Sequence, residues 1–311
     1  MSRNIEIIGD GCAALSFAAR AKDVHDSNIT IIKPNNAPES KDHVWGFWSD
    51  KSLKSASELT RGTWNKWAVI NHEQRIVMES VTKPYNAIKR SDWNEYCLTL
   101  AKSAGVKFIN QSDWQENQAN LIYDSRPPIA SENNLLQHFH GIEIETESPV
   151  FDSETAILMD FRVDQSKGMH FIYLLPYSAT KALVESTIFS HSVENEEFYM
   201  ESINSYLQQY YDIANYQITH QENGVIPLGK LSQHDPNFPG IGANGGAIRP
   251  ATGYAFLFIQ RQIDLAIKNY QKGKSLIFEP PHKRLDLWMD SVMLTVLRHW
   301  PELGPKMFIR M

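Results

Sequence analysis

A glycine-rich turn near the N-terminus restricts the chain to a small set of folds. Residues 4–8 alternate in the manner of a buried strand, and residues 12–21 predict a helix of small side chains directly after the turn. Residues 29–32 predict a second strand. Together these segments make one β-α-β unit, which is typical of a parallel sheet covered by helices.

The spacing of the small residues in this turn points to a ligand. Gly9, Gly11 and Ala14 form a Gly-x-Gly-x-x-Ala pattern, in which free N–H groups and the positive end of the helix dipole attract a phosphate. The alternative is a connection that is merely tight. The second strand of dinucleotide-binding folds commonly ends in Asp or Glu, which holds a ribose hydroxyl, whereas this chain has Lys33. The ribose would be held less well, or by another side chain from the set Asn35, Asn36 and Glu39.

A second glycine cluster lies more than two hundred residues downstream. Gly245, Gly246 and Pro250 precede an amphipathic helix, which we expect to begin near Thr252 and which would have Thr252 and Gly253 at its start. Such a cluster lets the backbone approach the far end of a dinucleotide, although helix-capping turns would explain some of its glycines. We therefore expect both ends of the chain to meet on one cofactor, a flavin dinucleotide.

Composition excludes several classes of protein. The net charge of −6 and the lack of a long Lys/Arg block argue against a nucleic-acid partner. Cys12 and Cys97 form no Cys-x-x-Cys pair, and the histidines show no metal-ligand spacing, so we expect neither a disulfide framework nor a metal. We find in the sequence neither a signal peptide nor a segment with the length of a membrane span, and we expect a cytoplasmic location.

The predicted elements divide the chain into three parts. Residues 1–135 and 220–270 are expected to form a Rossmann-like FAD-binding domain with a parallel sheet, in which Ser91 caps a helix. Residues 136–219 change to alternating runs, which predict an inserted antiparallel β-sheet substrate domain in an α/β fold. Residues 271–311 are expected to form a C-terminal helical region. The inserted strands are expected at 142–146, 156–161, 169–175 and 182–189.

Eight short motifs occur in an order that resembles one enzyme family. The ordered series is more specific than any single motif. It is similar to the series of the bacterial and plant lycopene cyclases, from about Ile5 to the C-terminus. The resemblance implies a flavin-dependent, non-redox cyclisation of the open ends of lycopene to β-ionone rings. The motifs are Trp45–Trp48, Tyr123–Pro127, Gln137–Gly141, Leu158–Arg162, Tyr173–Pro176, Val184–Thr187, Gly224–Pro227 and Arg249–Tyr254.

The resemblance also implies the cofactor chemistry. The flavin would be FAD in its reduced form, with NADPH as the expected reductant. Arg90 and Asp124 would join the two glycine clusters in binding it. A reduced, anionic ring near the substrate can stabilise a carbocation electrostatically without giving up electrons.

Glu185 is the expected acid/base residue. Cyclisation needs a proton delivered to a terminal alkene, a dry cavity that tolerates a carbocation, and a base that removes a proton after ring closure. Glu185 matches the acid/base glutamate of the family's motif and has apolar neighbours, so burial would raise its pKa. The alternative is a strand glutamate that faces water. The family's second acid is replaced by Ser186.

Three other polar residues are candidates for the site. Asp160 and Arg162 flank Phe161 on one strand and so project to the same side, either as catalytic groups or as a salt bridge of the sheet. Glu222 precedes a segment that the family uses near the flavin and the substrate, and its alternative is a solvated loop carboxylate. Aromatic side chains gathered at the site could shield a cation, although each alone is more typical of a core: Trp45, Phe47, Trp48, Phe139, Phe171, Tyr173, Tyr254 and Phe256.

A substrate as insoluble as lycopene must come from a membrane. We therefore expect peripheral association with the inner face of the membrane through exposed apolar residues of the C-terminal helices. The alternative is that these side chains pack inside the domain. The candidates are Trp288, Met289, Met293, Leu297 and Trp300.

Two other functions stay open. A FAD-dependent monooxygenase or halogenase shares the cofactor fold but performs net redox chemistry, although the sequence has no Trp-x-Trp-x-Ile-Pro segment of the kind typical of halogenases. A non-catalytic carotenoid- or flavin-binding relative is suggested by Lys33, by Ser186 and by a chain that stops at Met311, where family members usually continue. Glu185 and the intact turn at residues 250–254 argue against it.

Overall fold

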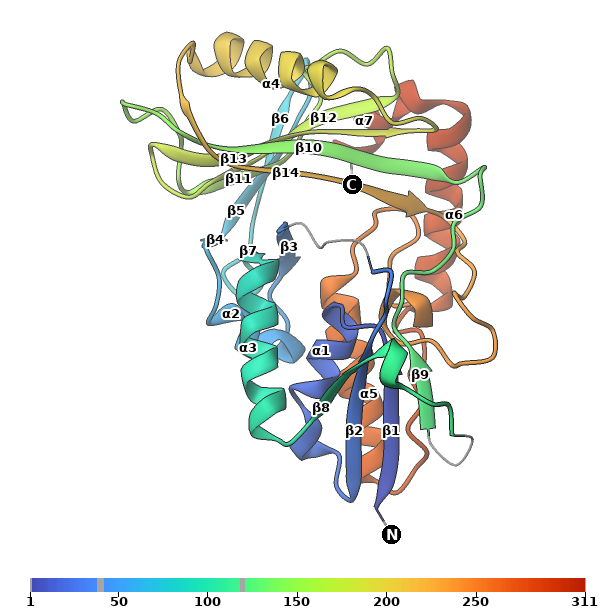
Figure 1. Cartoon of the computed structure of the whole chain (residues 1–311). Coiled ribbons are helices and arrows are strands. Elements are labelled where there is room, and N and C mark those ends of the chain that lie inside the picture. Colours follow the sequence, from blue (N-terminus) through green and yellow to red (C-terminus); the bar gives the residue numbers. More distant parts are fainter. Residues whose placement is uncertain (1, 38–41, 118–120, 311) are drawn as a thin grey trace.

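The computed structural model consists of two stacked units flanked on one side by a long helix (Figure 1). It describes residues 2–37, 42–117 and 121–310. One unit holds a parallel sheet with its helices, and the other holds a larger, mainly antiparallel sheet with a helix across its outer face. The predicted α/β fold, with a Rossmann-like parallel sheet, an antiparallel sheet and C-terminal helices, is confirmed.

The parallel sheet has four strands in the order β8-β2-β1-β9. Each neighbouring pair in it is parallel. The strands are β1 (Arg3–Ile8), β2 (Ser27–Lys33), β8 (Lys107–Asn110) and β9 (Leu121–Asp124). The helices of this unit are α1 (Cys12–Ala18), α3 (Arg90–Ser103) and α5 (Phe256–Gln271).

Small side chains bring α1 close to the parallel sheet. Ile5 and Ile7 of β1 are fully buried against Ala14 and Phe17 of α1 and Ile263 of α5. A parallel strand covered by helices is buried on both faces, which explains the isoleucines in the second half of β1, whereas Arg3 and Asn4 at its start are exposed. This packing fixes the N-terminus of α1 at the end of β1.

The larger sheet has seven strands in the order β14-β10-β13-β12-β11-β5-β6. The four predicted strands of the inserted sheet correspond to β10 to β13. Three further strands, from residues 66–79 and 217–228, also join it, so the sheet is wider than predicted, while the domain boundaries themselves stay a prediction. The strands are β5 (Lys66–Ile70), β6 (Arg75–Glu79), β10 (Leu135–Glu145), β11 (Thr155–Asp160), β12 (Met169–Pro176), β13 (Lys181–Ser190) and β14 (Gln217–Leu228).

Helix α4 (Glu196–Tyr211) covers one face of this sheet. Asn195 caps the helix, because its side-chain oxygen accepts a hydrogen bond from the Phe198 N–H at 3.0 Å. Ile203 of α4 packs with Ile142 and Val184 of the sheet. Residues at alternate strand positions therefore point to α4, and those between them point to the opposite face.

The remaining elements connect the two units. A small antiparallel sheet has the order β3-β7-β4, and α6 packs its buried side on the larger sheet. Its strands are β3 (Val44–Trp48), β4 (Gly62–Trp64) and β7 (Tyr85–Lys89). The other helices are α2 (Lys54–Ser57), α6 (Arg284–His299) and α7 (Gly304–Phe308), with 3-10 turns η1 (Ala21–Asp23), η2 (Lys51–Leu53), η3 (Gln111–Asp113), η4 (Gly242–Gly245) and η5 (Pro301–Leu303).

Two predicted helix starts are wrong by a few residues. Helix α3 begins at Arg90 with Lys89 as its N-cap, and Ser91 lies inside the first turn, where its N–H and hydroxyl both donate to the Asp42 carboxylate at 3.0 Å. Helix α5 begins at Phe256 and not near residue 252, because Gly253 has a φ of 67°, which is incompatible with a helix.

Candidate active site

Two buried carboxyl groups lie in one row across the larger sheet. The row runs through Tyr173, Glu185, Gly141 and Glu222, each directly opposite the next on neighbouring strands. Residues opposite one another project to the same face. Val184 packs towards α4, so the row faces away from that helix, towards the parallel-sheet unit. Glu185 is 8% exposed and Glu222 is 2% exposed.

Gly141 leaves the room that both carboxyl side chains occupy. A Cβ atom at this position would lie 2.7 Å from Cγ of Glu185 and 3.3 Å from Cγ of Glu222. An isolated glycine inside a strand often marks such a close approach. The motif that contains Gly141 was recognised in the sequence, but the spatial reason for the glycine comes from two other strands.

The environment holds a proton on this pair. Burial, followed by the charge of the neighbouring Glu222, raises the pKa of Glu185 well above its ordinary value. Burial also raises the pKa of Glu222, although interactions with Glu185 and with the Val44 N–H, which donates to Oε2 at 3.0 Å, oppose that rise. His220 Nε2 lies 3.7 Å from the same oxygen. Two adjacent buried carboxyls cannot both ionise cheaply, so the pair favours a state in which at least one of them is protonated.

Three tyrosine hydroxyls lie together near Glu185. The hydroxyl oxygen of Tyr85 lies 2.9 Å from that of Tyr173 and 3.2 Å from that of Tyr254. The Trp48 ring packs against Tyr85 and Tyr254, with centroids 4.9 and 5.6 Å apart. Burial raises the pKa of Tyr85 and Tyr173 well above the ordinary value, so these hydroxyls stay neutral. The wall beside Glu185 is therefore aromatic and uncharged.

Gly46 of β3 is required by the same hydroxyl cluster. A Cβ atom on Gly46 would lie 1.9 Å from the Tyr85 hydroxyl oxygen and 2.8 Å from that of Tyr173. Tyr85 was missed in the sequence, because a single tyrosine in an apolar strand is more typical of a core. Its importance comes from the three chain segments that meet at its hydroxyl.

Asp160 and Arg162 lie on the opposite face of the sheet. Arg162 donates from Nε and Nη2 to the Asp160 carboxylate at 2.9 and 2.6 Å, and Tyr206 of α4 donates its hydroxyl to the same group at 2.7 Å. Hydrogen bonding to Asp160 raises the pKa of the Arg162 guanidinium. The structure does not bring this pair to Glu185, and its geometry favours the salt-bridge alternative.

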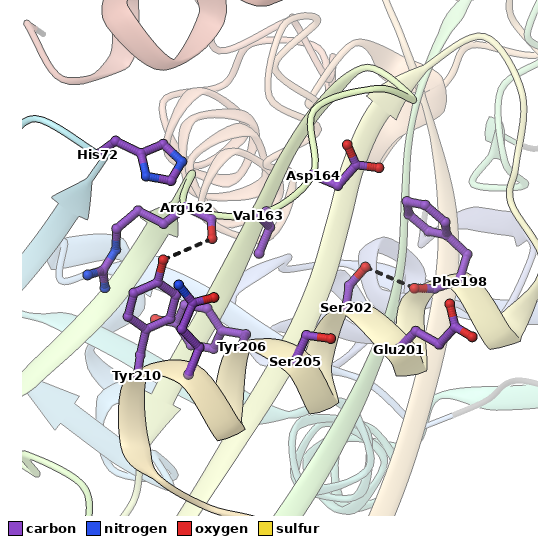
Figure 2. Close-up of a pocket in the computed structure, with 11 residues that line it drawn as sticks. His72, Arg162, Val163, Asp164, Phe198, Glu201, Ser202, Ser205, Tyr206 and Tyr210 are labelled. Atoms are coloured by element: carbon purple, nitrogen blue, oxygen red, sulfur yellow. Dashed lines mark hydrogen bonds between the residues drawn. The ribbon is translucent and has the colours of Figure 1, made fainter.

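Arg162 also borders a cleft beside α4 (Figure 2). The cleft has a volume of about 360 Å³, and the guanidinium carbon lies 3.8 Å from the centroid of the Tyr210 ring. The Tyr210 hydroxyl donates to the Arg162 carbonyl at 3.4 Å (Figure 2). Since the carboxyl row faces the other side of the sheet, this cleft is separate from the candidate site. Its lining residues are His72, Arg162, Val163, Asp164, Phe198, Glu201, Ser202, Ser205, Tyr206, Gln209 and Tyr210.

Ser186 stands where the resembling family has its second acid. It follows Glu185 on β13 and therefore points to the α4 face, where its hydroxyl oxygen lies 2.8 Å from Nε2 of His170. A carboxyl at this position would point away from Glu185. Glu222 of β14 supplies the second carboxyl on the side of the sheet where Glu185 lies.

The first glycine-rich turn has the geometry of a phosphate site. Gly9 has a φ of 105°, and a Cβ atom there would lie 2.4 Å from Oγ of Ser125, so the turn needs glycine. A Cβ atom on Gly11 would meet no atom within 4 Å, which shows open space at the N-terminus of α1. Ala14 is fully buried and lets α1 approach the sheet.

Arg90 places a positive charge near that open space. Burial raises the pKa of the Cys12 thiol to about 12, and the charge of Arg90 acts in the opposite direction on the same group. Arg90 is therefore close to the first residue of α1. Backbone N–H groups, open space and a nearby guanidinium together fit a pyrophosphate.

The segment just before the second glycine cluster touches the helix that follows the first cluster. Gly242 has a φ of 69°, and a Cβ atom there would lie 2.4 Å from Cβ of Ala13 in α1. Gly245 ends η4, and Gly246 follows in the left-handed conformation with a φ of 76°. The segment that leads into the second cluster therefore contacts the helix that follows the first, and the meeting of the two clusters on one cofactor stays a prediction.

The turn at residues 250–253 reaches the larger sheet. The Pro250 carbonyl accepts a hydrogen bond from the Gly229 N–H at 2.8 Å. A Cβ atom on Gly253, in the same turn as Thr252, would lie 2.8 Å from Cγ2 of Ile226 in β14. This turn therefore approaches the strand that carries Glu222.

Asp124 is paired within the protein. Its carboxylate is fully buried and accepts hydrogen bonds from Nε and Nη2 of Arg126, each at 2.9 Å. Of the residues predicted to hold the ribose, Asn35 has an Oδ1 that accepts from the Ser112 N–H at 3.2 Å, and Glu39 lies outside the described residues. Asp124 contributes by fixing the turn after β9.

Comparison with known proteins identifies the family. The model of the family described as Lycopene cyclase protein matches residues 4–299. This chain belongs to the lycopene cyclase family. A lycopene beta-cyclase of Paracoccus sp. (strain N81106 / MBIC 01143) is 30% identical over 159 residues, 48% of this chain and 40% of that protein. The capsanthin/capsorubin synthase of Citrus sinensis is 24% identical over 288 residues, 81% of this chain and 56% of that protein.

The chain thus spans about half the length of the curated relatives it matches. Among solved structures, a geranylgeranyl bacteriochlorophyll reductase-like protein of Thermoplasma acidophilum has a TM-score of 0.64 and 12% identity, covering 100% of this chain and 88% of that one. A flavin-dependent halogenase from Xanthomonas campestris has a TM-score of 0.60 and 10% identity, covering 95% and 75%. At these identities, the likeness shows a shared fold.

Only some of the residues predicted to contact the membrane are exposed on the surface. Trp288, Met289 and Trp300 are exposed, whereas Met293 and Leu297 are buried against the larger sheet. In the described part of the chain, every helix is too short or too polar to cross a bilayer. The three exposed side chains therefore form an apolar surface that is free to contact a membrane. The two buried side chains pack inside the domain, as the alternative stated.

Proposed function

We propose that this chain catalyses the FAD-dependent, non-redox cyclisation of the acyclic ends of lycopene to β-ionone rings. The observation that carries the proposal is the buried Glu185–Glu222 pair, which faces an aromatic, uncharged wall. A carboxyl that keeps its proton at neutral pH is suited to general acid catalysis. Membership of the lycopene cyclase family supports the substrate class.

Glu185 would act at both ends of the reaction. Its carboxyl donates a proton to the terminal double bond, which leaves a tertiary carbocation that the next double bond attacks to close the ring. The Glu185 carboxylate then removes a proton from the ring, so the product is an isomer of the substrate and the acid is regenerated. Glu222 keeps the pKa of Glu185 high by its proximity, and we assign Asp160 and Arg162 a structural role.

The aromatic wall would protect the cation. Trp48, Tyr85, Tyr173 and Tyr254 present ring faces and neutral hydroxyls, which attract a cation without adding to it as a strong nucleophile would. Exclusion of water from this space prevents hydration of the cation.

FAD would bind along the line of the two glycine clusters. Gly9, Gly11, Ala14 and Arg90 would hold the pyrophosphate, and Asp124 would fix the adjacent turn. When bound and reduced, with NADPH as the reductant, the cofactor would supply negative charge next to the cation. The end nearest the substrate would be held by Gly245, Gly246, Pro250, Thr252 and Gly253.

The exposed residues of α6 and the turn after it would bring the site to its substrate. Trp288, Met289 and Trp300 can insert into the headgroup region, while Arg284 and Arg298 of α6 can contact anionic lipid. We propose peripheral binding to the inner face of the cytoplasmic membrane.

Pigment analysis in cells that accumulate lycopene tests the proposal. We expect cyclic carotenoids in cells that express the wild type or a Glu145→Gln control, which changes a partly exposed glutamate paired with Lys181. Cells with Glu185→Gln should keep lycopene. If wild-type protein is soluble and binds flavin but leaves lycopene unchanged, the cyclase proposal is wrong, and the redox or binding-protein alternatives gain support.

A further inference from the structure

The larger sheet ends in a strand whose outer edge is exposed. β6 is the last strand in the order and pairs with β5 on its other side. Arg75, Ile76, Val77 and Glu79 are all exposed, and Val77 is exposed to 48%. An exposed edge strand presents backbone N–H and C=O groups that can pair with another strand.

The hydrogen bonds between β5 and β6 show which backbone N–H and C=O groups of β6 point to the open edge. At the two ends of β6, the Gln74 carbonyl accepts from Asn71 at 3.0 Å, and the Ser80 N–H donates to Asn65 at 2.8 Å. Hydrogen-bonded and non-hydrogen-bonded pairs alternate along an antiparallel ladder. The backbone N–H and C=O groups of residues 76 and 78 therefore form hydrogen bonds with β5. The residues whose N–H and C=O groups point to the open edge are Arg75, Val77 and Glu79.

The strand is complementary to itself in the antiparallel direction. When Val77 lies opposite Val77 of a second copy, Arg75 lies opposite Glu79 of that copy, and Ile76 lies opposite Met78. The outward-pointing residues then form the hydrogen-bonded pairs of the new ladder. Opposite charges and apolar pairs at directly facing positions both stabilise a sheet.

We propose that β6 is the interface of a homodimer, in which two copies join their larger sheets edge to edge around Val77. The partner strand is β6 of a second copy of this chain. In a single register, opposite charges face each other, apolar side chains face each other, and the outward-pointing backbone groups form hydrogen bonds. The inference does not depend on the proposed reaction.

The symmetry of this pairing places the two sites on one side. The two-fold axis of an antiparallel pair centred on a hydrogen-bonded position is perpendicular to the sheet. Both α4 helices then lie on one face of the joined sheet, and both carboxyl pairs lie on the other. Two sites on the same side could approach one membrane surface together.

Charge reversal with rescue tests the interface. The molar mass of the purified 311-residue chain, measured by light scattering over a concentration series, should be that of a dimer. Arg75→Glu places two carboxylates opposite each other at both ends of the ladder, and we expect a monomer. Arg75→Glu combined with Glu79→Arg restores opposite charges, and we expect the dimer to return. Gln217→Glu on β14, the other edge strand, is the matched control and should leave the dimer intact.

Hydrogen exchange gives a second reading of the same interface. The backbone N–H groups of Arg75, Val77 and Glu79 should be protected in the wild type and exchange faster in Arg75→Glu, while circular dichroism stays unchanged. A wild-type monomer at tens of micromolar would overturn the proposal. A dimer that survives Arg75→Glu, or that is not restored in the double variant, would overturn it as well.

Discussion

Glu185 and Glu222 share one buried space because Gly141, which has no side chain, stands between them on β10. Burial raises the pKa of both groups, and the charge of Glu222 raises the pKa of Glu185 further. A fold does not need two adjacent buried carboxyls for its stability. Such a pair is typical of a site where proton transfer is the function.

Gly141→Ala should separate the two carboxyls. The new Cβ would overlap Glu185 and crowd Glu222, so we expect a loss of about 1–3 kcal/mol in the free energy of unfolding. Displacement of the acid from its position should lower cyclase activity by about 100-fold. Gly304→Ala is the control, since its Cβ would meet the flexible Met169 side chain in another cluster. Full activity in Gly141→Ala would contradict the role of the pair.

The pH dependence of the reaction should report the acid form of Glu185. Because its pKa is raised, the acid form persists above the usual range of carboxyl groups, and kcat/KM should fall as the pH rises through that pKa. Glu222→Gln removes the neighbouring charge and lowers the pKa of Glu185. The alkaline limb of the kcat/KM profile should therefore move to lower pH in this variant. Glu145→Gln should not move it, and an unmoved limb in Glu222→Gln would refute the coupling.

Glu185→Gln should stabilise the folded protein at alkaline pH. The pKa of Glu185 is raised on folding, so its contribution to stability is fully present below the pKa of the unfolded chain and is lost as the pH rises through the folded pKa. Glutamine carries no charge to bury. We expect a gain of about 1–2 kcal/mol above neutral pH that shrinks in acid, measured by urea unfolding at several pH values. Equal stability of both proteins at alkaline pH would argue against burial of this charge.

The N-terminal β-α-β unit could be predicted from the sequence because its determinants are local. Gly9 and Ala14 belong to one turn and the helix that follows it, and the isoleucines of β1 show directly that the strand is buried. The helix starts were less accurate. The Asp42 carboxylate that binds Ser91 lies 49 positions away, so nothing near Ser91 distinguishes a cap from a first-turn residue.

The candidate site was only partly predictable, because it is made by contacts between distant strands. Alternation placed Asp160 and Arg162 on the same side of the chain, which their bidentate contact confirms. Alternation does not tell which side α4 will cover, and this decides that the pair lies away from Glu185. Tyr85 was missed for the same reason, since its hydroxyl partners are 88 and 169 positions away.

Tyr85→Phe should weaken the link between the two units. Its hydroxyl joins Tyr173 of the larger sheet to Tyr254 of the turn before α5, and removal leaves two buried hydroxyls without that shared partner. We expect a loss of about 1–3 kcal/mol in the free energy of unfolding, with lower cyclase activity. Tyr210→Phe removes one long hydrogen bond to the Arg162 carbonyl and should cost less. Equal losses in the two variants would show that the tyrosine cluster contributes no more to stability than one long hydrogen bond.

Membrane binding should depend on the exposed indoles near the C-terminus. Trp288 is 62% exposed and Trp300 is 51% exposed. An apolar side chain that enters the bilayer interface contributes about 1.5 kcal/mol or more, so Trp288→Ser/Trp300→Ser should lower the fraction that floats with liposomes by at least about tenfold. Val81→Ser changes a side chain that is 74% exposed but lies outside the C-terminal helices, and it should float as the wild type does. Activity on detergent-dispersed lycopene should survive in the double variant, because neither tryptophan belongs to the carboxyl row or its aromatic wall. Wild-type protein that does not float with anionic vesicles, or a double variant that floats equally well, would show that this surface does not carry the contact.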